Sequence, residues 1–376
     1  MKSRIFARIS LAVLACLILA CAPGFKSNPK LLGGGNWHWK SFRNAANNQA
    51  SVRIQHPVPT RLNWRFHAKA SNVSTPLVRG NTVILASLDR RIYFLNAGTG
   101  SKITQIVLNV PATTPCAAGN VLYFGLSGED GEVCAFDYVV GQMLWKVKVG
   151  EITSPIVLEN GKVYVGTASG NLLCLNSSTG KEIWRFKTSG HIQSSVSVER
   201  GNLYFGSLDG NLYCLDPADG SQKWKFKSRA GVFTSPAADG ENIYFGSADS
   251  VFYCLDSSGI KQWEFKTDGA IYSSACLDSN QVYFGSSDGK LYCLAKSTGG
   301  LVWEFATGSL IHSSPILVGN AVSFGCFDRN FYTLDCRTGE IAFKYTTAGI
   351  ISASASFGSG RYFISGEDRY LYCFGS

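Results

Sequence analysis

Short runs of aromatic and aliphatic residues recur along this chain at a nearly constant interval. The clearest run is LYCLD at 212–216, and near copies of it lie about 40 residues apart. A period of this length is typical of repeat proteins, in which each unit buries its faces against its neighbours. With Cys214 as the marker, the equivalent positions are Phe94, Ala135, Cys174, Cys254, Cys293, Thr333 and Cys373, so the chain contains eight units.

Each unit has the pattern of four short strands joined by tight turns. Apolar and polar residues alternate in the first strand, the second is built of small residues, and the last two are aromatic and β-branched. Asp-Gly stands at the last turn in two units, at 209–210 and 288–289, and this pair favours the φ > 0 geometry of a two-residue hairpin. No stretch after the first 20 residues has convincing helical periodicity. The strands expected in the unit that begins at Trp224 are 224–226, 234–238, 243–247 and 251–255.

Four-stranded antiparallel sheets at this period are typical of propeller blades, and a propeller must join its last blade to its first. The last unit ends at 371–374 with only three strands, whereas LNWRF at 62–66 matches an outer strand and precedes the first complete set. We therefore expect an all-β fold, an eight-bladed β-propeller of four-stranded antiparallel blades that an N-terminal strand closes.

The N-terminus predicts export. Basic residues precede an apolar run at 9–20, which is too short to span a membrane comfortably and ends in ILAC at 18–21. This pattern is typical of a secretory signal peptide. A cysteine directly after the cut site resembles the bacterial lipoprotein box, and the resemblance implies that Cys21 is the lipid attachment site. The alternative is an ordinary export signal with an incidental cysteine.

The domain boundaries follow from this reading. We expect a lipoprotein signal peptide at 1–20, a flexible tether at 21–36 that contains GGG at 33–35, and the propeller at 37–376. Lipoproteins of this type stay at the inner membrane when an aspartate follows the lipidated cysteine, and here that residue is Ala22. The resemblance implies an exported protein that is anchored to the outer membrane and faces the periplasm.

Cysteines and charge limit the chemistry. An exported chain with 12 cysteines suggests disulfides, but those at the repeat position belong to separate blades about 10 Å apart, too far for a bridge. We expect them to be small buried hydrophobes, and a disulfide among the irregular cysteines stays open. Without CxxC or clustered histidines we expect no metal and no cofactor. Removing the signal peptide lowers the formal charge from +9 to +6, and no basic stripe indicates a nucleic-acid partner.

A family resemblance rests on the turn into the outer strand. NSSTGKEIW at 176–184 and DPADGSQKW at 216–224 resemble the tryptophan-docking motif of the pyrroloquinoline quinone (PQQ)-like repeat. In that family the glycine makes the turn and the indole packs against the adjacent blade. The lead-in at 37–43 is similar too, and the signature of WD-type propellers is absent. Further tryptophans at the same place are Trp145, Trp263 and Trp303, with Phe343 in the last copy.

PQQ-like propellers include dehydrogenases and binding scaffolds, so the fold alone does not assign a function. The dehydrogenases have long insertions, an adjacent cysteine pair and acidic residues that hold calcium; this chain has no Cys-Cys and little room for insertions. Signal peptide, tether and blade count resemble the BamB family, lipoproteins of the outer-membrane β-barrel assembly machinery. The resemblance implies a non-enzymatic scaffold that binds the barrel-insertion protein. An envelope binding module for a saccharide or peptide stays an alternative.

Two groups of residues are candidate partner-binding sites on one face. Blades seven, eight and one carry arginines at the turn where other blades have glycine, and these four arginines would suit an acidic partner. They are Arg90, Arg91, Arg329 and Arg369. The alternative is that they only pair with their own turn aspartates.

The second group is a ring at the mouth of the central channel, which could accept a peptide or a planar ligand or could simply cap the packing. Its members are Val73, Ala112, Ile152, Gln193, Phe233, Tyr272, His312 and Ile351, of which Phe233, Tyr272 and His312 are the aromatic candidates.

Overall fold

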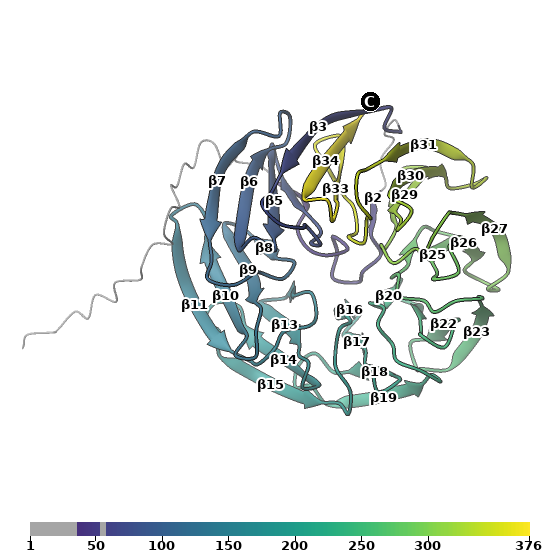
Figure 1. Cartoon of the computed structure of the whole chain (residues 1–376). Helices are drawn as coiled ribbons and strands as arrows, with labels where there is room; N and C mark the ends of the chain where they lie inside the picture. Colours follow the sequence, from purple (N-terminus) through teal and green to yellow (C-terminus); the bar gives the residue numbers. More distant parts are fainter. Residues whose placement is uncertain (1–35, 53–57) are drawn as a thin grey trace, which may run out of the picture.

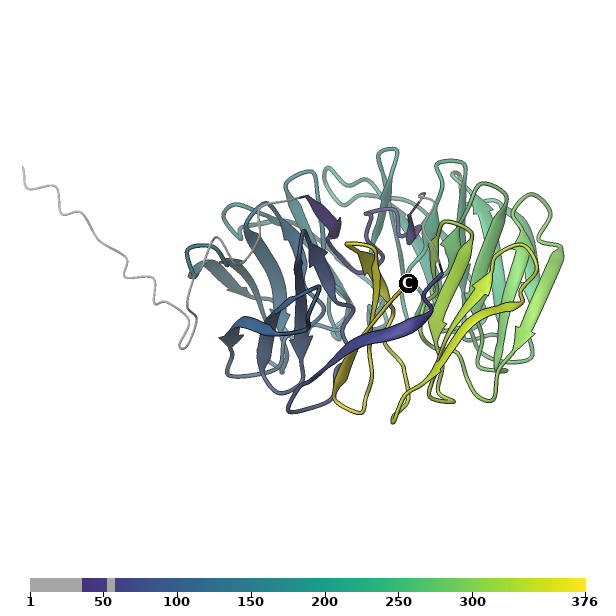
Figure 2. The same cartoon turned by 90° about the horizontal axis from the view of Figure 1, so that it is seen from above.

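Eight antiparallel sheets surround a central axis in the computed structural model, which describes residues 36–52 and 58–376 (Figure 1). The side view shows the blades standing next to one another around the ring, with their turns at its two faces (Figure 2). Each blade contains four consecutive strands except the last, as the period predicted. The eight-bladed fold expected from the sequence is confirmed.

The strands of blades one to four are β4 (Leu77–Arg79), β5 (Thr82–Ser87), β6 (Arg91–Asn96), β7 (Lys102–Val107); β8 (Cys116–Ala118), β9 (Val121–Leu126), β10 (Glu132–Asp137), β11 (Gln142–Lys148); β12 (Val157–Glu159), β13 (Lys162–Gly166), β14 (Asn171–Asn176), β15 (Glu182–Lys187); and β16 (Ser197–Glu199), β17 (Asn202–Gly206), β18 (Asn211–Leu215), β19 (Gln222–Lys227).

Those of blades five to eight are β20 (Ala237–Ala238), β21 (Asn242–Gly246), β22 (Val251–Asp256), β23 (Lys261–Lys266); β24 (Cys276–Leu277), β25 (Gln281–Gly285), β26 (Lys290–Ala295), β27 (Leu301–Ala306); β28 (Ile316–Val318), β29 (Ala321–Gly325), β30 (Asn330–Asp335), β31 (Ile341–Thr346); and β32 (Ser356–Gly358), β33 (Arg361–Ser365), β34 (Tyr370–Gly375) with β3 (Arg61–His67). The short strands β1 (Trp37–Trp39) and β2 (Ser51–Val52) join blades one and seven.

Burial follows strand position within a blade. All residues of β18 are buried, whereas exposed and half-buried residues alternate along most of β19, as in a strand with one face in solvent. Sheets packed on both sides need near-continuous apolar runs in their middle strands, which explains why the aromatic runs recur there.

The N-terminal strand closes the ring. β3 pairs antiparallel with β34, from Arg61 opposite Gly375 to His67 opposite Tyr370. Trp64 of β3 donates its Nε1 hydrogen to the Ala97 carbonyl of blade one, 3.0 Å away. The predicted closing strand is therefore confirmed.

The strand expected at 234–238 is shorter than predicted. Only β20, Ala237–Ala238, pairs in the sheet. Pro236 has no N–H to donate, and the Ser235 N–H donates sideways to Ser274 Oγ of the next blade, 2.8 Å away. The small residues at this position thus connect neighbouring blades and do not extend the ladder.

The docking tryptophans pack as the family resemblance implied. The indole of Trp184 lies against Gly220 of the following blade, whose φ is +77° and whose added Cβ would meet the ring at 2.7 Å. Trp184 also donates from Nε1 to the Pro217 carbonyl at 3.2 Å. The same arrangement joins Trp64 to Gly100, Trp145 to Gly180, Trp224 to Gly259, Trp263 to Gly299 and Trp303 to Gly339.

Residues 37–52, here called the plug, lie across one end of the central channel. β1 pairs with β4, and β2 pairs in parallel with β28 (Figure 1). Between them, the carbonyls of Lys40, Ala46, Asn47, Gln49 and Ala50 accept hydrogen bonds from the amides of Ala117, Val198, Ala238, Leu277 and Leu317. The plug therefore binds the innermost strands of six blades.

Two fully buried polar side chains of the plug bind carbonyls in the channel. Arg43 donates to the carbonyl oxygens of Pro315, at 2.8 Å, and Ala275. Asn48 donates from Nδ2 to those of Val196 and Pro236, at 3.0 and 3.2 Å. Burial lowers the pKa of Arg43 to about 10. The sequence marks 37–43 only as a lead-in, and this role was not anticipated.

The predicted signal peptide, Cys21 and nearly all of the tether lie outside the described residues. The ten cysteines of the described part are buried free thiols, and burial raises their pKa values, for example that of Cys214 to about 12. Within residues 36–52 and 58–376, no helix is long and apolar enough to cross a membrane.

Candidate functional site

The two faces of the ring differ. The mouth face carries the turn between the two middle strands of each blade (β5 and β6 in blade one) and the loop that leads into the innermost strand (β4 in blade one). The plug face carries the other turns and the plug. At the mouth face the central channel forms a cavity of about 230 Å³, here called the cup. Phe42 of the plug lines the cup, so the cup is closed at its other end.

The three predicted aromatic residues come together at the rim of the cup. Phe233, Tyr272 and His312 belong to blades five, six and seven and all line the cavity. The ring centroids of Phe233 and Tyr272 are 5.0 Å apart at 84°, and those of Tyr272 and His312 are 4.9 Å apart at 67°. They form an edge-to-face wall on one side of the cup. Val73, Gln193 and Ser352 line other parts of it.

Three members of the predicted ring lie elsewhere. Ile152 and Ile351 are buried, and the Ile351 side chain packs on Gly325 of the preceding blade. They stand one residue before the lining position, which Ser352 occupies in blade eight. Ala112 is also nearly buried and does not line the cup. Apolar residues at adjacent positions shifted the predicted register in blades three and eight.

A belt of hydroxyl groups lies in the wall of the cup. The oxygen of Ser235 accepts the Ser195 N–H at 2.9 Å, Ser274 accepts from Ser235 at 2.8 Å, Ser314 from Ser274 at 3.0 Å, and Ser354 from Ser314 at 3.1 Å. Each of these bonds joins neighbouring blades and fixes the position of one serine hydroxyl oxygen. Among the described residues, none accepts the hydroxyl protons of Ser235, Ser274, Ser314 and Ser354.

The lining of the cup carries no side chain with a permanent charge. His312 is the one titratable imidazole in it; burial lowers its pKa, and its Nε2 lies 3.1 Å from Ser287 Oγ. The imidazole is therefore neutral at pH 7. The cup is a neutral site with one aromatic wall and a belt of hydroxyls.

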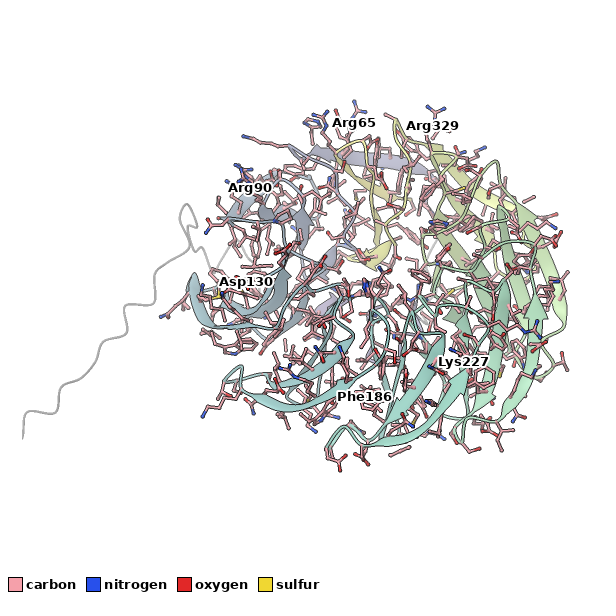
Figure 3. The ribbon with its side chains drawn as sticks, turned by 60° about the horizontal axis from the view of Figure 1, so that its bottom comes forward. Arg65, Arg90, Asp130, Phe186, Lys227 and Arg329 are labelled. Atoms are coloured by element: carbon pink, nitrogen blue, oxygen red, sulfur yellow. The ribbon has the colours of Figure 1, made fainter. Side chains whose placement is uncertain are left out.

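The predicted arginines lie on the same face, outside the cup. Arg90, Arg329 and Arg369 are exposed and adopt φ values of 66°, 71° and 73°, in the left-handed region that glycine occupies in blades three, four and six and Ser250 in blade five. With the exposed Arg65 and Lys344 of the adjoining outer strands they form what we call the closure sector. Figure 3 shows Arg90, Arg65 and Arg329 along one side of the ring.

Arg91 differs from the other three arginines. It is half-buried, donates to the Asp89 carbonyl at 3.0 Å and lies 3.9 Å from the Asp89 carboxylate. Within the described residues, no carboxylate lies within ion-pair distance of Arg90, Arg329 or Arg369. Pairing with the turn aspartate thus describes Arg91 only.

The turn aspartates are instead occupied by neutral donors. The Asp328 carboxylate accepts hydrogen bonds from the Tyr332 hydroxyl at 2.6 Å and from the backbone N–H of Asn330 at 3.0 Å. Burial raises the pKa of Asp328, but these hydrogen bonds outweigh it and the pKa lies below the usual value. The same Asp-to-Tyr bond recurs in blades one, four, five, six and eight. These carboxylates hold the turns and leave the arginines facing solvent.

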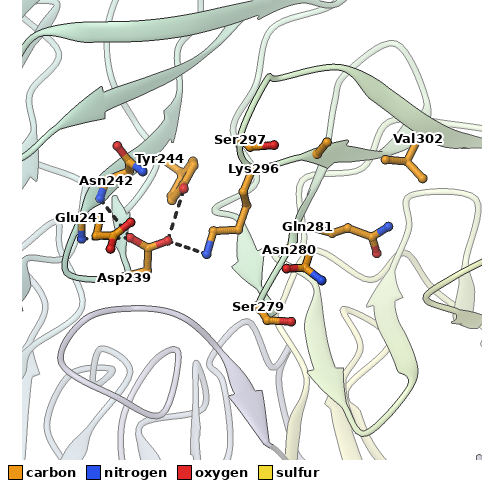
Figure 4. Close-up of a pocket in the computed structure, with 11 residues that line it drawn as sticks. Asp239, Glu241, Asn242, Tyr244, Ser279, Asn280, Gln281, Lys296, Ser297 and Val302 are labelled. Atoms are coloured by element: carbon orange, nitrogen blue, oxygen red, sulfur yellow. Dashed lines mark hydrogen bonds and ion pairs between the residues drawn. The ribbon is translucent and has the colours of Figure 1, made fainter.

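A larger cavity of about 400 Å³ lies between blades five and six and is lined by residues at turns of the plug face (Figure 4). Its charged centre is the ion pair of Lys296 with Asp239, 2.5 Å apart and largely buried. Burial raises the pKa of Asp239, but Lys296 and backbone donors more than offset this and lower it overall. The pair joins two blades, so we regard it as structural.

The residues of the cup do not fit PQQ, the cofactor that some propellers of this fold hold. PQQ carries carboxylates, which need cationic partners when they leave water. No Lys or Arg lines the cup, and neither does an Asp or Glu that could hold a calcium ion. The described part of the chain contains no group of three or more His, Cys, Asp or Glu side chains placed to hold a metal.

Comparison with solved structures places the fold. BamB from Moraxella catarrhalis superposes with a TM-score of 0.73 at 17% identity, covering 85% of this chain and all of that one. Quinohemoprotein alcohol dehydrogenase from Comamonas testosteroni gives a TM-score of 0.77 at 13% identity, covering 90% and 81%. At these identities the likeness concerns the fold alone.

Sequence comparison identifies relatives. Outer membrane protein assembly factor BamB from Nitrosomonas eutropha is 27% identical over 190 residues, which are 48% of this chain and 44% of the relative. The alignment thus spans less than half of that relative. The chain is a PQQ-like repeat propeller that resembles BamB. The model of the family described as "Beta-alanine-activating enzyme, beta-propeller" matches residues 74–323, and the chain belongs to this β-propeller family.

Proposed function

We propose that this protein is a non-enzymatic, lipid-anchored scaffold of the bacterial cell envelope that assists the assembly and insertion of outer-membrane β-barrel proteins. The observation that carries the proposal is the sequence similarity to outer membrane protein assembly factor BamB. A signal peptide at 1–20, Cys21 as the lipid attachment site, a tether at 21–36 and residence at the periplasmic side of the outer membrane belong to the same proposal.

The closure sector is the surface we propose for the protein partner. A left-handed backbone costs a residue with a side chain about 1–2 kcal/mol, so arginine in place of glycine at three neighbouring turns favours a role for the side chain. Strained positions of this kind gather at functional sites. The turn aspartates are occupied by tyrosines and backbone amides. Uncommitted guanidinium groups are suited to bidentate contacts with carboxylates of an acidic partner.

Crosslinking the lipidated protein in native envelopes, followed by purification and mass spectrometry, tests the function. Recovery of the barrel-insertion protein supports the scaffold. Recovery of only glycan or peptidoglycan enzymes would contradict it and favour the second candidate, an envelope binding module for a saccharide or peptide. The cup is the observation that favours this second candidate. A PQQ-dependent dehydrogenase has the least support, because the cup lining does not suit that cofactor.

Replacing Arg90, Arg329 and Arg369 together by glycine tests the docking surface. Glycine accepts φ > 0 without strain, so the variant keeps or gains thermal stability, while partner capture falls by about tenfold, or ~1.4 kcal/mol. The remaining capture also becomes less sensitive to salt. The matched control is Lys181→Gln, Lys225→Gln and Lys266→Gln, which removes three exposed charges from blades three to five. Equal capture by both variants would refute the surface.

A further inference from the structure

The cup is a blind site and not a passage. Phe42 lines it from the plug, and the plug is hydrogen-bonded to six blades beneath it. A polypeptide therefore cannot thread through the ring, and only a small molecule or the end of a longer one can enter. The volume of about 230 Å³ is below the range of roughly 300–1,000 Å³ that is typical of drug-sized ligands. The occupant is therefore small.

The charge of the lining decides the charge of the occupant. No Lys, Arg, Asp or Glu lines the cup, and His312 is neutral at pH 7. An anion moved from water into such a site lacks a cationic partner and is strongly disfavoured. The Glu367 carboxylate, which accepts the hydroxyl proton of the lining Ser352 at 2.5 Å, disfavours anions further. Carboxylates, phosphates and the charged C-terminus of a peptide are therefore poor occupants.

The two sides of the cup favour different chemical groups on a ligand. The wall of Phe233, Tyr272 and His312 presents aromatic surface that packs against an apolar face. The belt of Ser235, Ser274, Ser314 and Ser354 offers hydroxyl protons that no described residue accepts. A neutral ring with an apolar face and a rim of hydroxyl groups satisfies both sides at once.

We propose that the cup binds one neutral pyranose ring, either a free sugar or the terminal residue of a glycan. The C–H face of the sugar packs on the rim of Tyr272 and Phe233, and its hydroxyl groups accept from the serine belt. This site shares no residue with the closure sector.

Saturation-transfer NMR and calorimetry on the full chain test the proposal. The probes are N-acetyl-D-glucosamine and methyl β-D-glucopyranoside, with D-glucuronate as the charged match and N-acetyl-tyrosinamide as the peptide-like match. We expect Kd values in the millimolar range for the neutral sugars and much weaker binding for glucuronate. A chitotriose probe separates the two sources: binding at least as tight as that of the monosaccharide indicates a glycan end, and weaker binding indicates a free sugar.

Variants locate the binding. Tyr272→Ala removes the middle ring of the three-residue aromatic wall and weakens sugar binding by about tenfold. Tyr370→Ala, a partly exposed aromatic residue that contacts His67 outside the cup, leaves it unchanged. Failure of both neutral sugars to bind, glucuronate binding as tightly as they do, preference for N-acetyl-tyrosinamide, or equal effects of the two substitutions would each overturn the proposal. Neither readout depends on the scaffold function, because no partner protein is present.

Discussion

Two glycines of blade four allow the contact of a docking tryptophan to be measured. Gly220 and Gly201 have nearly the same backbone, with φ values of +77° and +75°. A Cβ at Gly220 would lie 2.7 Å from the indole of Trp184, whereas a Cβ at Gly201 meets nothing within 4 Å. Alanine at either position adopts a left-handed backbone, at a cost of about 1–2 kcal/mol. Only Gly220→Ala also overpacks the indole, which adds about 1–3 kcal/mol.

We therefore expect Gly220→Ala to lower the free energy of unfolding by about 2–5 kcal/mol, and Gly201→Ala by the backbone cost alone. Equilibrium unfolding in urea, followed by far-UV circular dichroism, measures both. In a Trp184→Ala background, Gly220→Ala should cost no more than Gly201→Ala, because the clash is gone; the double-mutant cycle gives the coupling energy. Equal losses for the two glycines in the parent protein would refute the docking contact.

Two further predictions concern buried polar groups. Asn48→Asp places a carboxylate oxygen beside the carbonyls of Val196 and Pro236, which lie 3.0 and 3.2 Å from the present Nδ2. We expect chemical unfolding to show a free energy of unfolding lower by about 3–5 kcal/mol at pH 7, and a smaller loss at acidic pH, where the acid is protonated. A loss that does not change with pH would contradict this. The pKa of Asp209 is lowered because hydrogen bonds from Tyr213, Asn211 and the backbone outweigh burial, so its stabilisation is complete above the unfolded value of about 3.9 and is lost as the pH falls through the folded pKa. Thermal melts of Asp209→Asn should therefore depend less on pH below about 4, whereas Asp130→Asn, at an exposed carboxylate, should follow the parent.

The blades, their number and the closing strand could be predicted because their signals are local and repeated. The plug could not, since it binds backbone carbonyls and amides of six blades and these carry no side-chain signature. A lone Arg43 in a polar segment is expected to lie in solvent, although in the structure the surrounding blades bury it. The Asp-to-Tyr bonds had a signal that was overlooked: tyrosine follows the turn aspartate by four residues, as in Asp209 and Tyr213 or Asp368 and Tyr372.

The plug also has a consequence for the order of folding. The plug precedes the blades in the chain, yet β2 lacks its partner until β28, Ile316–Val318, has followed it, and β3 waits for β34 near the C-terminus. β2 and β3 must therefore stay without these partners while the blades between them form. Contacts over such sequence separations are slow to form. Completion of the ring and sealing of its channel are consequently late events, although β2 and β3 precede all the strands from β4 to β34 in the sequence.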